Sequence, residues 1–176
     1  ELSCDYRIGI DVMTTETSCL TSIWETDETI RRYYENIGRP EDFRELHPEN
    51  GAYYDSVVKI DLSRMESMIA LPFHPSIAYT VHEVQADPER IFAEVEEAAN
   101  RQLGGKVKLD LRRNIVDGKV TCDQGVIVGC SGGMYENIVE ASKILDGQSI
   151  GNGYFDISVY PSSTPISLAI TRSGVA

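Results

Sequence analysis

The sequence predicts an α/β domain of three layers, with helices on both faces of a mixed, mostly parallel sheet. Two observations lead to this prediction. Segments with the apolar pattern of strands are followed, several times along the chain, by segments with the 3.6-residue period of helices. In addition, Asp117-Gly118 lies between two stretches of alternating apolar residues, which is typical of a hairpin. Part of the sheet is therefore expected to be antiparallel.

The first half of the chain predicts strands and two helices. Strands are expected at residues 7–13 (RIGIDVM) and 56–62 (SVVKIDL), and residues 68–76 (MIALPFHPS) form another apolar stretch, broken by two prolines. The first helix follows Asp27, whose side chain can cap it, and ends at Gly38. The second helix starts at Asp87-Pro88, a cap followed by proline at the first helical position, and ends at Gly104-Gly105.

The second half predicts a hairpin, two strands and two helices. The expected elements are the hairpin at 106–122, a buried strand at 126–130, a helix from 134 to 145, a strand at 154–161 and a last short helix at 166–174. Because we find neither an internal repeat nor a low-complexity linker, a single domain over residues 1–176 is expected.

Composition narrows the class of protein. The chain has 176 residues, 41% of them apolar, and a formal net charge of −12, so it is globular and a poor partner for nucleic acid or an anionic membrane. No apolar run approaches the ~20 residues of a membrane span, and no signal peptide is recognised. The four cysteines are scattered, which favours reduced thiols in a cytoplasmic protein. The start without methionine suggests a piece of a longer protein.

The glycine-rich turn GCSGG, residues 129–133, is the main candidate site. Gly-x-Ser-x-Gly makes Ser131 a possible nucleophile, but all three histidines precede it, whereas the base of that motif follows the serine. Backbone amides where a helix begins also suit an anion. Cys130, between a strand and a helix, is favoured as a thiolate, which is either a nucleophile or a ligand of a soft metal. A purely structural turn is the remaining alternative.

Four segments, in order along the chain, resemble the aconitase superfamily. They are MTTETSCLTSIWETDETIRRYY (13–34), YDSVVKIDLSRMESMIALPFHPS (54–76), GCSGGMYENIVEASKILDG (129–147) and VYPSSTPISLAITRSGV (159–175). The resemblance covers nearly the whole chain. It implies the third α/β domain of the iron–sulfur core of an aconitase-like hydratase, separated from its parent.

The resemblance also implies roles for particular residues. Cys130 would be one of three thiolates that hold a [4Fe–4S] cluster, and Glu16 would help to place the iron-bound water and its proton. Ser131 and Gly132 would lie next to the bound substrate anion. The other two cluster cysteines form a Cys-x-x-Cys pair, which this chain lacks. We therefore expect the isolated chain to be folded, cluster-free and inactive, and the parent's other domains to be needed for action on a small hydroxy acid.

A second hypothesis remains open, namely a stand-alone binding or interaction module that kept the fold without catalysis. Val12, Gly132 and Asn137 differ from the family's pattern and favour this alternative. Glu16 is also compatible with a solvated acid on a loop rich in Thr and Ser.

Overall fold

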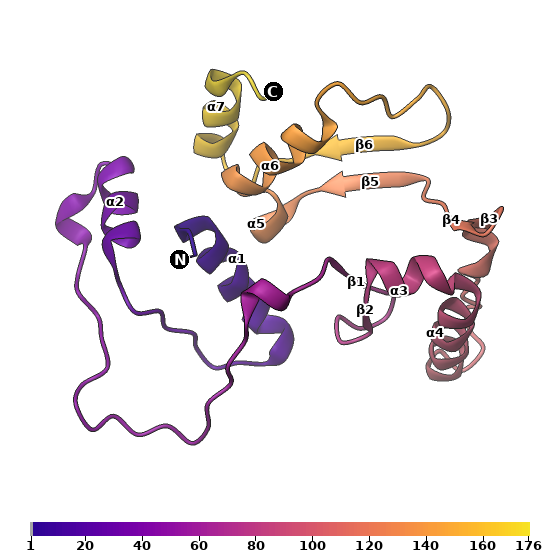
Figure 1. The fold of residues 1–176 in the computed structure, drawn as a ribbon, viewed down its shortest axis with the longest axis horizontal. Coiled ribbons are helices and arrows are strands. Elements are labelled where there is room, and N and C mark those ends of the chain that lie inside the picture. The colour runs from indigo at the N-terminus through magenta and orange to yellow at the C-terminus, as the bar shows by residue number, and fades with distance from the viewer. Residues whose placement is uncertain (1) are drawn as a thin grey trace. The chain divides into compact units, whose positions relative to one another are not determined.

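The computed structural model describes residues 2–176, which separate into two units. The first unit comprises the chain up to Asp55 together with Gln124–Ala176, and the second comprises Ser56–Asp123. The prediction that the whole chain forms one domain stays a prediction. Figure 1 labels the elements, and each unit is described by itself below.

The first unit begins with helix α1, Cys4–Met13, where the sequence predicted a strand at 7–13. That prediction was wrong. Ile8, Ile10 and Val12 favour strands, but local signals favour a helix, because Ser3 caps its start by accepting a hydrogen bond from the Tyr6 amide (3.3 Å). A 3-10 helix η1, Thr14–Thr17, follows directly.

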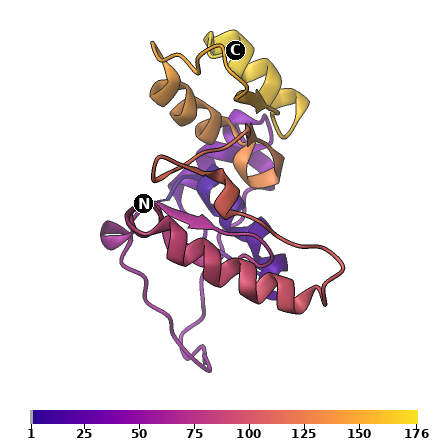
Figure 2. The same cartoon turned by 90° about the vertical axis from the view of Figure 1, so that its right-hand side faces the viewer.

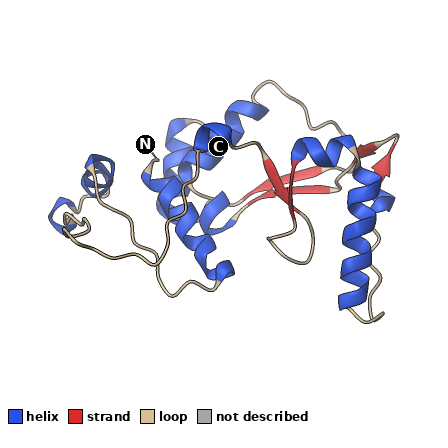
Figure 3. Ribbon diagram, turned by 60° about the horizontal axis from the view of Figure 1, so that its bottom comes forward, coloured by secondary structure: helices blue, strands red, loops and turns tan. Residues whose placement is uncertain are grey.

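Helix α2, Glu28–Asn36, confirms the prediction made from its cap. Asp27 accepts a hydrogen bond from the Ile30 amide (3.1 Å), and Gly38 follows the helix in the left-handed region with φ 74°. A short 3-10 helix η2, Pro40–Asp42, comes next. Long loops then connect this region to the next strand (Figure 3).

The C-terminal part of the first unit is a parallel strand pair with helices. Strand β5, Gln124–Ile127, pairs in parallel with β6, Asp156–Val159, so that Ile127 lies opposite Val159 (Figure 1). The helices are α5, Gly129–Gly132; α6, Tyr135–Leu145; and α7, Thr164–Ser173. Both predicted helices and the strand predicted at 154–161 are confirmed to within a few residues. The strand predicted at 126–130 is confirmed only in part, because it ends at Ile127, residues 129–130 begin α5, and it is not buried as predicted.

The second unit contains two small hairpins and two helices. Its elements are η3, Leu62–Arg64; β1, Met68–Ala70; β2, Ala78–Thr80; α3, Val81–Ala86; α4, Pro88–Gln102; η4, Arg112–Asn114; β3, Ile115–Val116; and β4, Lys119–Val120. The hairpin predicted at 106–122 is confirmed around its turn, because β3 and β4 are antiparallel and joined by Asp117 and Gly118, both at positive φ, whereas residues 106–114 form no strand. The strand predicted at 56–62 was wrong. Among the described residues no strand pairs with this segment, and the Asp61 side chain accepts a hydrogen bond from the Ser63 amide (3.1 Å) to start a 3-10 turn.

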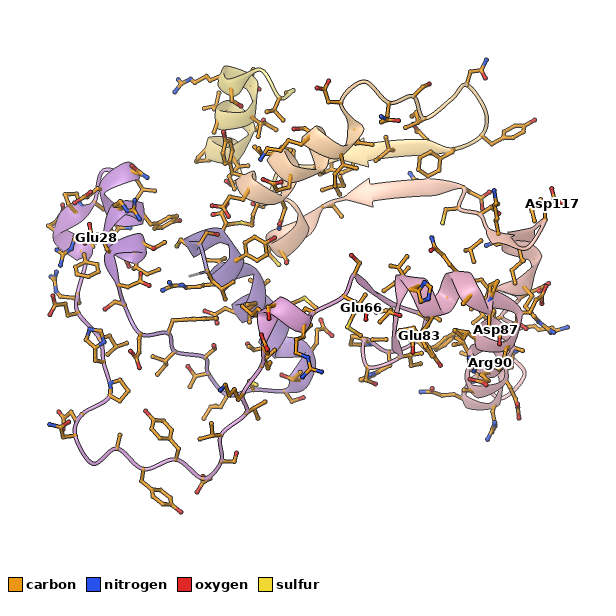
Figure 4. The ribbon with its side chains drawn as sticks, viewed as in Figure 1. Glu28, Glu66, Glu83, Asp87, Arg90 and Asp117 are labelled. Atoms are coloured by element: carbon orange, nitrogen blue, oxygen red, sulfur yellow. The ribbon has the colours of Figure 1, made fainter. Side chains whose placement is uncertain are left out.

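The start of α4 confirms the predicted cap (Figure 4). Asp87 accepts hydrogen bonds from the amide of Arg90 (3.3 Å) and from its guanidinium (2.8 Å), and the two side chains lie together at the first helical turn. Upstream, Thr80 and Glu83 form a complete capping box for α3. Figure 2 shows α4 as the long unbroken helix of this unit.

The apolar core lies in the second unit. Its buried members are Leu71, Val84, Ile91, Phe92 and Val95. Ile91 is fully buried, as its place on the predicted apolar face of α4 requires. The sheets of the described residues are three separate pairs of strands, one parallel and two antiparallel. The chain is thus mixed α and β, but the three-layer arrangement and the mostly parallel sheet are not confirmed. Of the helices in residues 2–176, none has the length and apolar character needed to cross a bilayer.

Candidate functional site

The glycine-rich turn follows β5 and reverses the chain into a one-turn helix. Val128 is extended, and Gly129 has φ 91°, a left-handed conformation that residues with a side chain rarely adopt. The Gly133 amide then donates to the Gly129 carbonyl (2.9 Å) and closes α5. The first glycine of the motif is therefore required by the backbone itself.

Gly133 is required by a close backbone approach. A Cβ at this position would lie 2.6 Å from the Tyr160 carbonyl oxygen, 2.7 Å from that of Gly129 and 2.9 Å from the Ser162 nitrogen. In return, the Ser162 amide donates to the Gly133 carbonyl (2.9 Å). The turn after β5 is thus fastened to the segment that follows β6, and no side chain fits between them.

Ser131 faces α1 rather than a catalytic base. A Cβ added to Gly9 of α1 would lie 3.2 Å from the Ser131 Oγ, so this hydroxyl packs against the helix at its glycine. The Asn137 side-chain amide donates to the Ser131 carbonyl (2.8 Å). Among the hydrogen bonds of residues 2–176, none joins Ser131 to a histidine; His47 and His74 pair with Glu25 and Ser76 instead. The arrangement does not favour a serine nucleophile.

Cys130 and Gly132 occupy the open side of the same turn. Cys130 is exposed, and a Cβ added to Gly132 would meet nothing within 4 Å. There is consequently room beside the thiol for a ligand. Within residues 2–176, no three His, Cys, Asp or Glu side chains come together as a metal site, and all four cysteines are free. The turn offers a single accessible thiol.

Glu16 lies on η1, immediately after α1. It is exposed, and its backbone is fixed by neighbouring threonines, since the Thr14 hydroxyl donates to the Asp11 carbonyl (2.6 Å) and the Thr17 hydroxyl to the Thr14 carbonyl (2.9 Å). Helix α1 packs against α5, the one-turn helix of Cys130. The helix that precedes Glu16 therefore packs against the turn of Cys130, and Glu16 itself lies on the 3-10 helix that follows.

Two polar side chains of α1 were missed by the sequence analysis. Arg7 is buried and forms an ion pair with Asp27, and Asp11, one turn further on, accepts hydrogen bonds from Ser22 and Trp24. The Arg7 guanidinium, as hydrogen-bond donor, lowers the pKa of Asp27, and the Ile30 amide acts in the same direction. If residues 7–13 had been interpreted as a helix, the i, i+4 spacing of Arg7 and Asp11 would have placed both side chains on one face of it.

The start of α1 is also tied to the start of α6. The Ser3 hydroxyl donates to the Glu136 carboxylate, and the Glu136 amide donates to Asp5 (3.2 Å). Cys4 lies in this region, where burial, followed by the nearby carboxylate of Asp5, raises the pKa of its thiol to about 11. Cys4 is therefore a protonated, unreactive thiol at neutral pH.

A cavity lies elsewhere in the first unit. It measures about 830 Å³ and is bordered by β5, β6, α6 and α7, with Ile127, Ile138 and Ile170 among its lining side chains. None of Glu16, Cys130, Ser131 and Gly132 lines it. The candidate site is an open turn rather than a closed pocket.

Comparison with known proteins gives one consistent result. The family model described as "Aconitase family (aconitate hydratase)" matches residues 1–176. A 3-isopropylmalate dehydratase large subunit 2 of Rubrobacter xylanophilus is 29% identical over 163 residues, which is 85% of this chain and 37% of that protein. A large subunit 1 of the same name from Thermotoga maritima is 29% identical over 90 residues, 51% of this chain and 22% of that protein.

A third relative, the 3-isopropylmalate dehydratase large subunit 2 of Archaeoglobus fulgidus, is 25% identical over 125 residues, or 65% of this chain and 30% of that protein. The chain thus spans between 22% and 37% of the length of the curated relatives it matches.

Proposed function

This chain belongs to the aconitase family, and on that premise we propose that it is a domain of a longer hydro-lyase. The parent would add water to, or remove it from, a small hydroxy acid at a [4Fe–4S] cluster. The relatives named as dehydratase large subunits support this reaction class. The observation that carries the proposal is the exposed Cys130 thiol. It lies on a turn in which Gly129 is required by its left-handed conformation and Gly133 by the close approach of the neighbouring backbone.

Cys130 fits the role of one cluster ligand. Thiolate sulfur is the usual donor to iron–sulfur clusters, and this thiol is accessible, with open space beside Gly132. Because such a cluster takes three cysteine ligands in this family, the other two have to come from the parent outside residues 1–176. When bound, the cluster would supply a Lewis-acidic iron that polarises the substrate's hydroxyl and carboxylate.

The roles of this chain's own residues follow from their places. Glu16 is an exposed carboxylate on a tightly bonded turn next to α1, which suits it to accept or return a proton of the substrate or of water. Ser131 and Gly132 belong to the same turn as Cys130. Because the Ser131 hydroxyl packs against α1, we assign the backbone of these two residues to contacts with the substrate's anionic end. The Asn137 amide keeps the turn's carbonyl at Ser131 occupied, so that the turn holds its shape when a ligand binds.

The same premise explains why the isolated chain should be inactive. One thiol and one carboxylate form an incomplete site, and the rest would come from the parent's other domains. Since the relatives are named large subunits, we also propose that the parent assembles with a further subunit. The competing function is a non-catalytic binding module on the same fold, favoured by the neutral Asn137 on the helix that follows the turn.

The test uses the full-length parent, purified without oxygen and supplied with iron and sulfide. Dehydration of small hydroxy acids, isopropylmalate included, is followed by the ultraviolet absorption of the unsaturated product. We expect Cys130→Ser to abolish turnover and Glu16→Gln to lower kcat by about 10²-fold or more. Glu35→Gln, at an exposed carboxylate on α2, is the control and should retain full activity.

An active Cys130→Ser variant would contradict the assignment of the cluster ligand. A parent that shows no turnover with any hydroxy acid would favour the binding module instead.

A further inference from the structure

The loop that carries Glu16 is closed at its base by one side chain. We define the Glu16 loop as residues 12–21, which leave α1 near Asp11 and return at Ser22. The Asp11 Oδ1 atom accepts a hydrogen bond from the Ser22 hydroxyl (2.6 Å) and another from the Trp24 indole Nε1 (2.6 Å). A single carboxylate therefore connects the returning limb of the loop to the helix from which the loop departs.

The returning limb is held again one helical turn earlier. The Arg7 guanidinium lies 5.8 Å from the centroid of the Trp24 ring, donates to the Glu25 carbonyl (3.4 Å) and pairs with Asp27. Arg7 and Asp11 are four residues apart and so lie on one face of α1. The indole is consequently fixed at its face by a cation and at its N–H by a carboxylate.

Within the loop, local hydrogen bonds fix the backbone around Glu16 but do not tie the far limb to α1. The Thr15 hydroxyl donates to the Val12 carbonyl (3.0 Å), and the amides of Ser18 and Cys19 donate to the carbonyls of Thr15 and Thr14 (both 3.2 Å). Residues 14–19 thus form a stiff turn. The Thr14 and Thr15 hydroxyls join this turn to the Asp11 and Val12 carbonyls of α1. The Asp11 side chain holds the limb beyond the turn, at Ser22 and Trp24, to the same helix.

We propose that Asp11 is a positioning residue that holds Glu16 in place by closing this loop on Ser22 and Trp24. The inference rests on the proposed role of Glu16 in moving a proton. The bonds of Asp11 to Ser22 and Trp24 limit where the returning limb lies, and with it the turn of Glu16 from which that limb continues. A shift of about 1 Å in a catalytic group can lower a rate by about 10²-fold, so the effect of losing Asp11 is measurable.

The test compares Asp11→Ala with Asp11→Asn in the full-length parent. The asparagine variant keeps an Oδ1 acceptor for Ser22 and Trp24, whereas the alanine variant has none. We expect kcat to fall about tenfold or more in Asp11→Ala, with KM changed by less than twofold, and to be largely restored in Asp11→Asn. Equal losses in both variants would overturn the positioning role, because they would show that the charge and not the bond is needed.

Trp24, the only tryptophan of the chain, provides an independent readout. Its emission is obtained by subtracting the spectrum of Trp24→Phe from that of the parent, and likewise in the Asp11→Ala background. We expect the Asp11→Ala difference spectrum to shift to longer wavelength and to be quenched more readily by acrylamide, since the indole loses its partner. If the spectrum moves while kcat stays constant, loop closure does not position a catalytic group and the proposal is wrong.

The two proposals fail in distinguishable ways. If Glu16→Gln retains full kcat, the role of Glu16 itself is wrong, whatever Asp11 does. If Glu16→Gln is impaired but Asp11→Ala retains both kcat and the Trp24 emission of the parent, the role of Glu16 stands and the positioning role of Asp11 is overturned.

Discussion

The unit of residues 56–123 contains a contiguous cluster of five buried apolar side chains, whereas the unit that carries the glycine-rich turn combines the buried Met134, Ile138 and Ile170 with a network of polar contacts around α1. In the former, α4 buries one face against Leu71, Val84 of α3 and the partly buried Tyr79 of β2, with Ile91 fully enclosed. In the latter, Arg7 pairs with Asp27, and Asp11 binds Ser22 and Trp24. The candidate chemistry thus lies in the unit with fewer buried apolar side chains.

The site-bearing unit also exposes apolar side chains on its parallel strand pair. Val126 of β5, Val128 directly after this strand and Tyr160 directly after β6 are each about half exposed. Parallel strands are normally covered on both faces, so a bare face on such a pair is unusual for a complete domain. This exposure agrees with the proposal that the chain is part of a longer protein.

The largest effect on stability is expected from the core of the second unit. Ile91→Ala removes three buried carbon atoms and leaves a cavity, at an expected cost of about 3 kcal/mol in the free energy of unfolding. Ile60→Ala, at an exposed isoleucine of the same unit, is the matched control and should cost less than about 0.5 kcal/mol. Urea titration followed by far-ultraviolet circular dichroism measures both. Similar losses in the two variants would mean that the unit has no specific core.

The next largest loss of stability is expected from a substitution in the backbone of the glycine-rich turn. Gly133→Ala places a Cβ against three backbone atoms that have no flexible side chain to move, and should destabilise by about 2 kcal/mol. Gly132→Ala adds the same methyl group to open space one residue earlier and should be nearly neutral. Thermal unfolding of the two variants checks the contrast. A neutral Gly133→Ala would show that the turn and the end of β6 are not fastened together.

A smaller effect on the free energy of unfolding is expected at Glu96 in the second unit. Burial raises the pKa of this carboxyl, but hydrogen bonds from the Arg112 amide (2.8 Å) and guanidinium (2.9 Å) outweigh it and lower the pKa overall. The resulting stability is present above the unfolded value of about 4.3 and is lost as the pH falls through the folded pKa.

Glu96→Gln should therefore lower the free energy of unfolding by roughly 1.5 kcal/mol at pH 7 and by progressively less in acid. Unfolding free energies measured between pH 7 and pH 3 would contradict this account if the difference between the variant and the parent did not shrink.

The smallest effect at neutral pH concerns Cys4. Its raised pKa, about 11 against 9.0, leaves folding unaffected below pH 9 and removes stability as the pH rises from 9 to 11. In a variant with serine at the other three cysteines, the thiolate fraction at pH 8 should be about 100-fold lower in the native chain than in the denatured chain. Labelling rates with iodoacetamide, with and without urea, test this. Equal rates would show that the thiol is not buried.

Local sequence signals predicted the elements that begin and end with a cap. Asp27, the Asp87-Pro88 pair and the Asp117-Gly118 turn each specify their own conformation within a few residues, and the structure confirms all three. The segment 7–13 was misassigned because its isoleucines and valine favour a strand, while the deciding Ser3 cap lies before it and Gly9 packs against a residue 122 positions later. Contacts of that kind cannot be inferred from a local pattern.

The same distinction applies to the site. The glycines of the turn and the exposed thiol of Cys130 follow from local sequence. The packing of α1 on α5, which places the helix before Glu16 beside the turn of Cys130, is a long-range contact. The bonds of Asp11 to Ser22 and Trp24 depend on a helix that the sequence analysis interpreted as a strand. The candidate residues were therefore accessible from sequence, but their mutual arrangement was not.

The central claim, that Cys130 is a ligand of a [4Fe–4S] cluster in the parent, is tested most directly by the cluster's visible absorption. The full-length protein, its Cys130→Ser variant and, as a control, its Cys122→Ser variant are prepared anaerobically with equal iron and sulfide. Both replaced cysteines are exposed, so accessibility does not distinguish them. The account predicts cluster absorption in the parent and in Cys122→Ser, and its loss in Cys130→Ser. A Cys130→Ser protein with the parent's full absorption and iron content would contradict it.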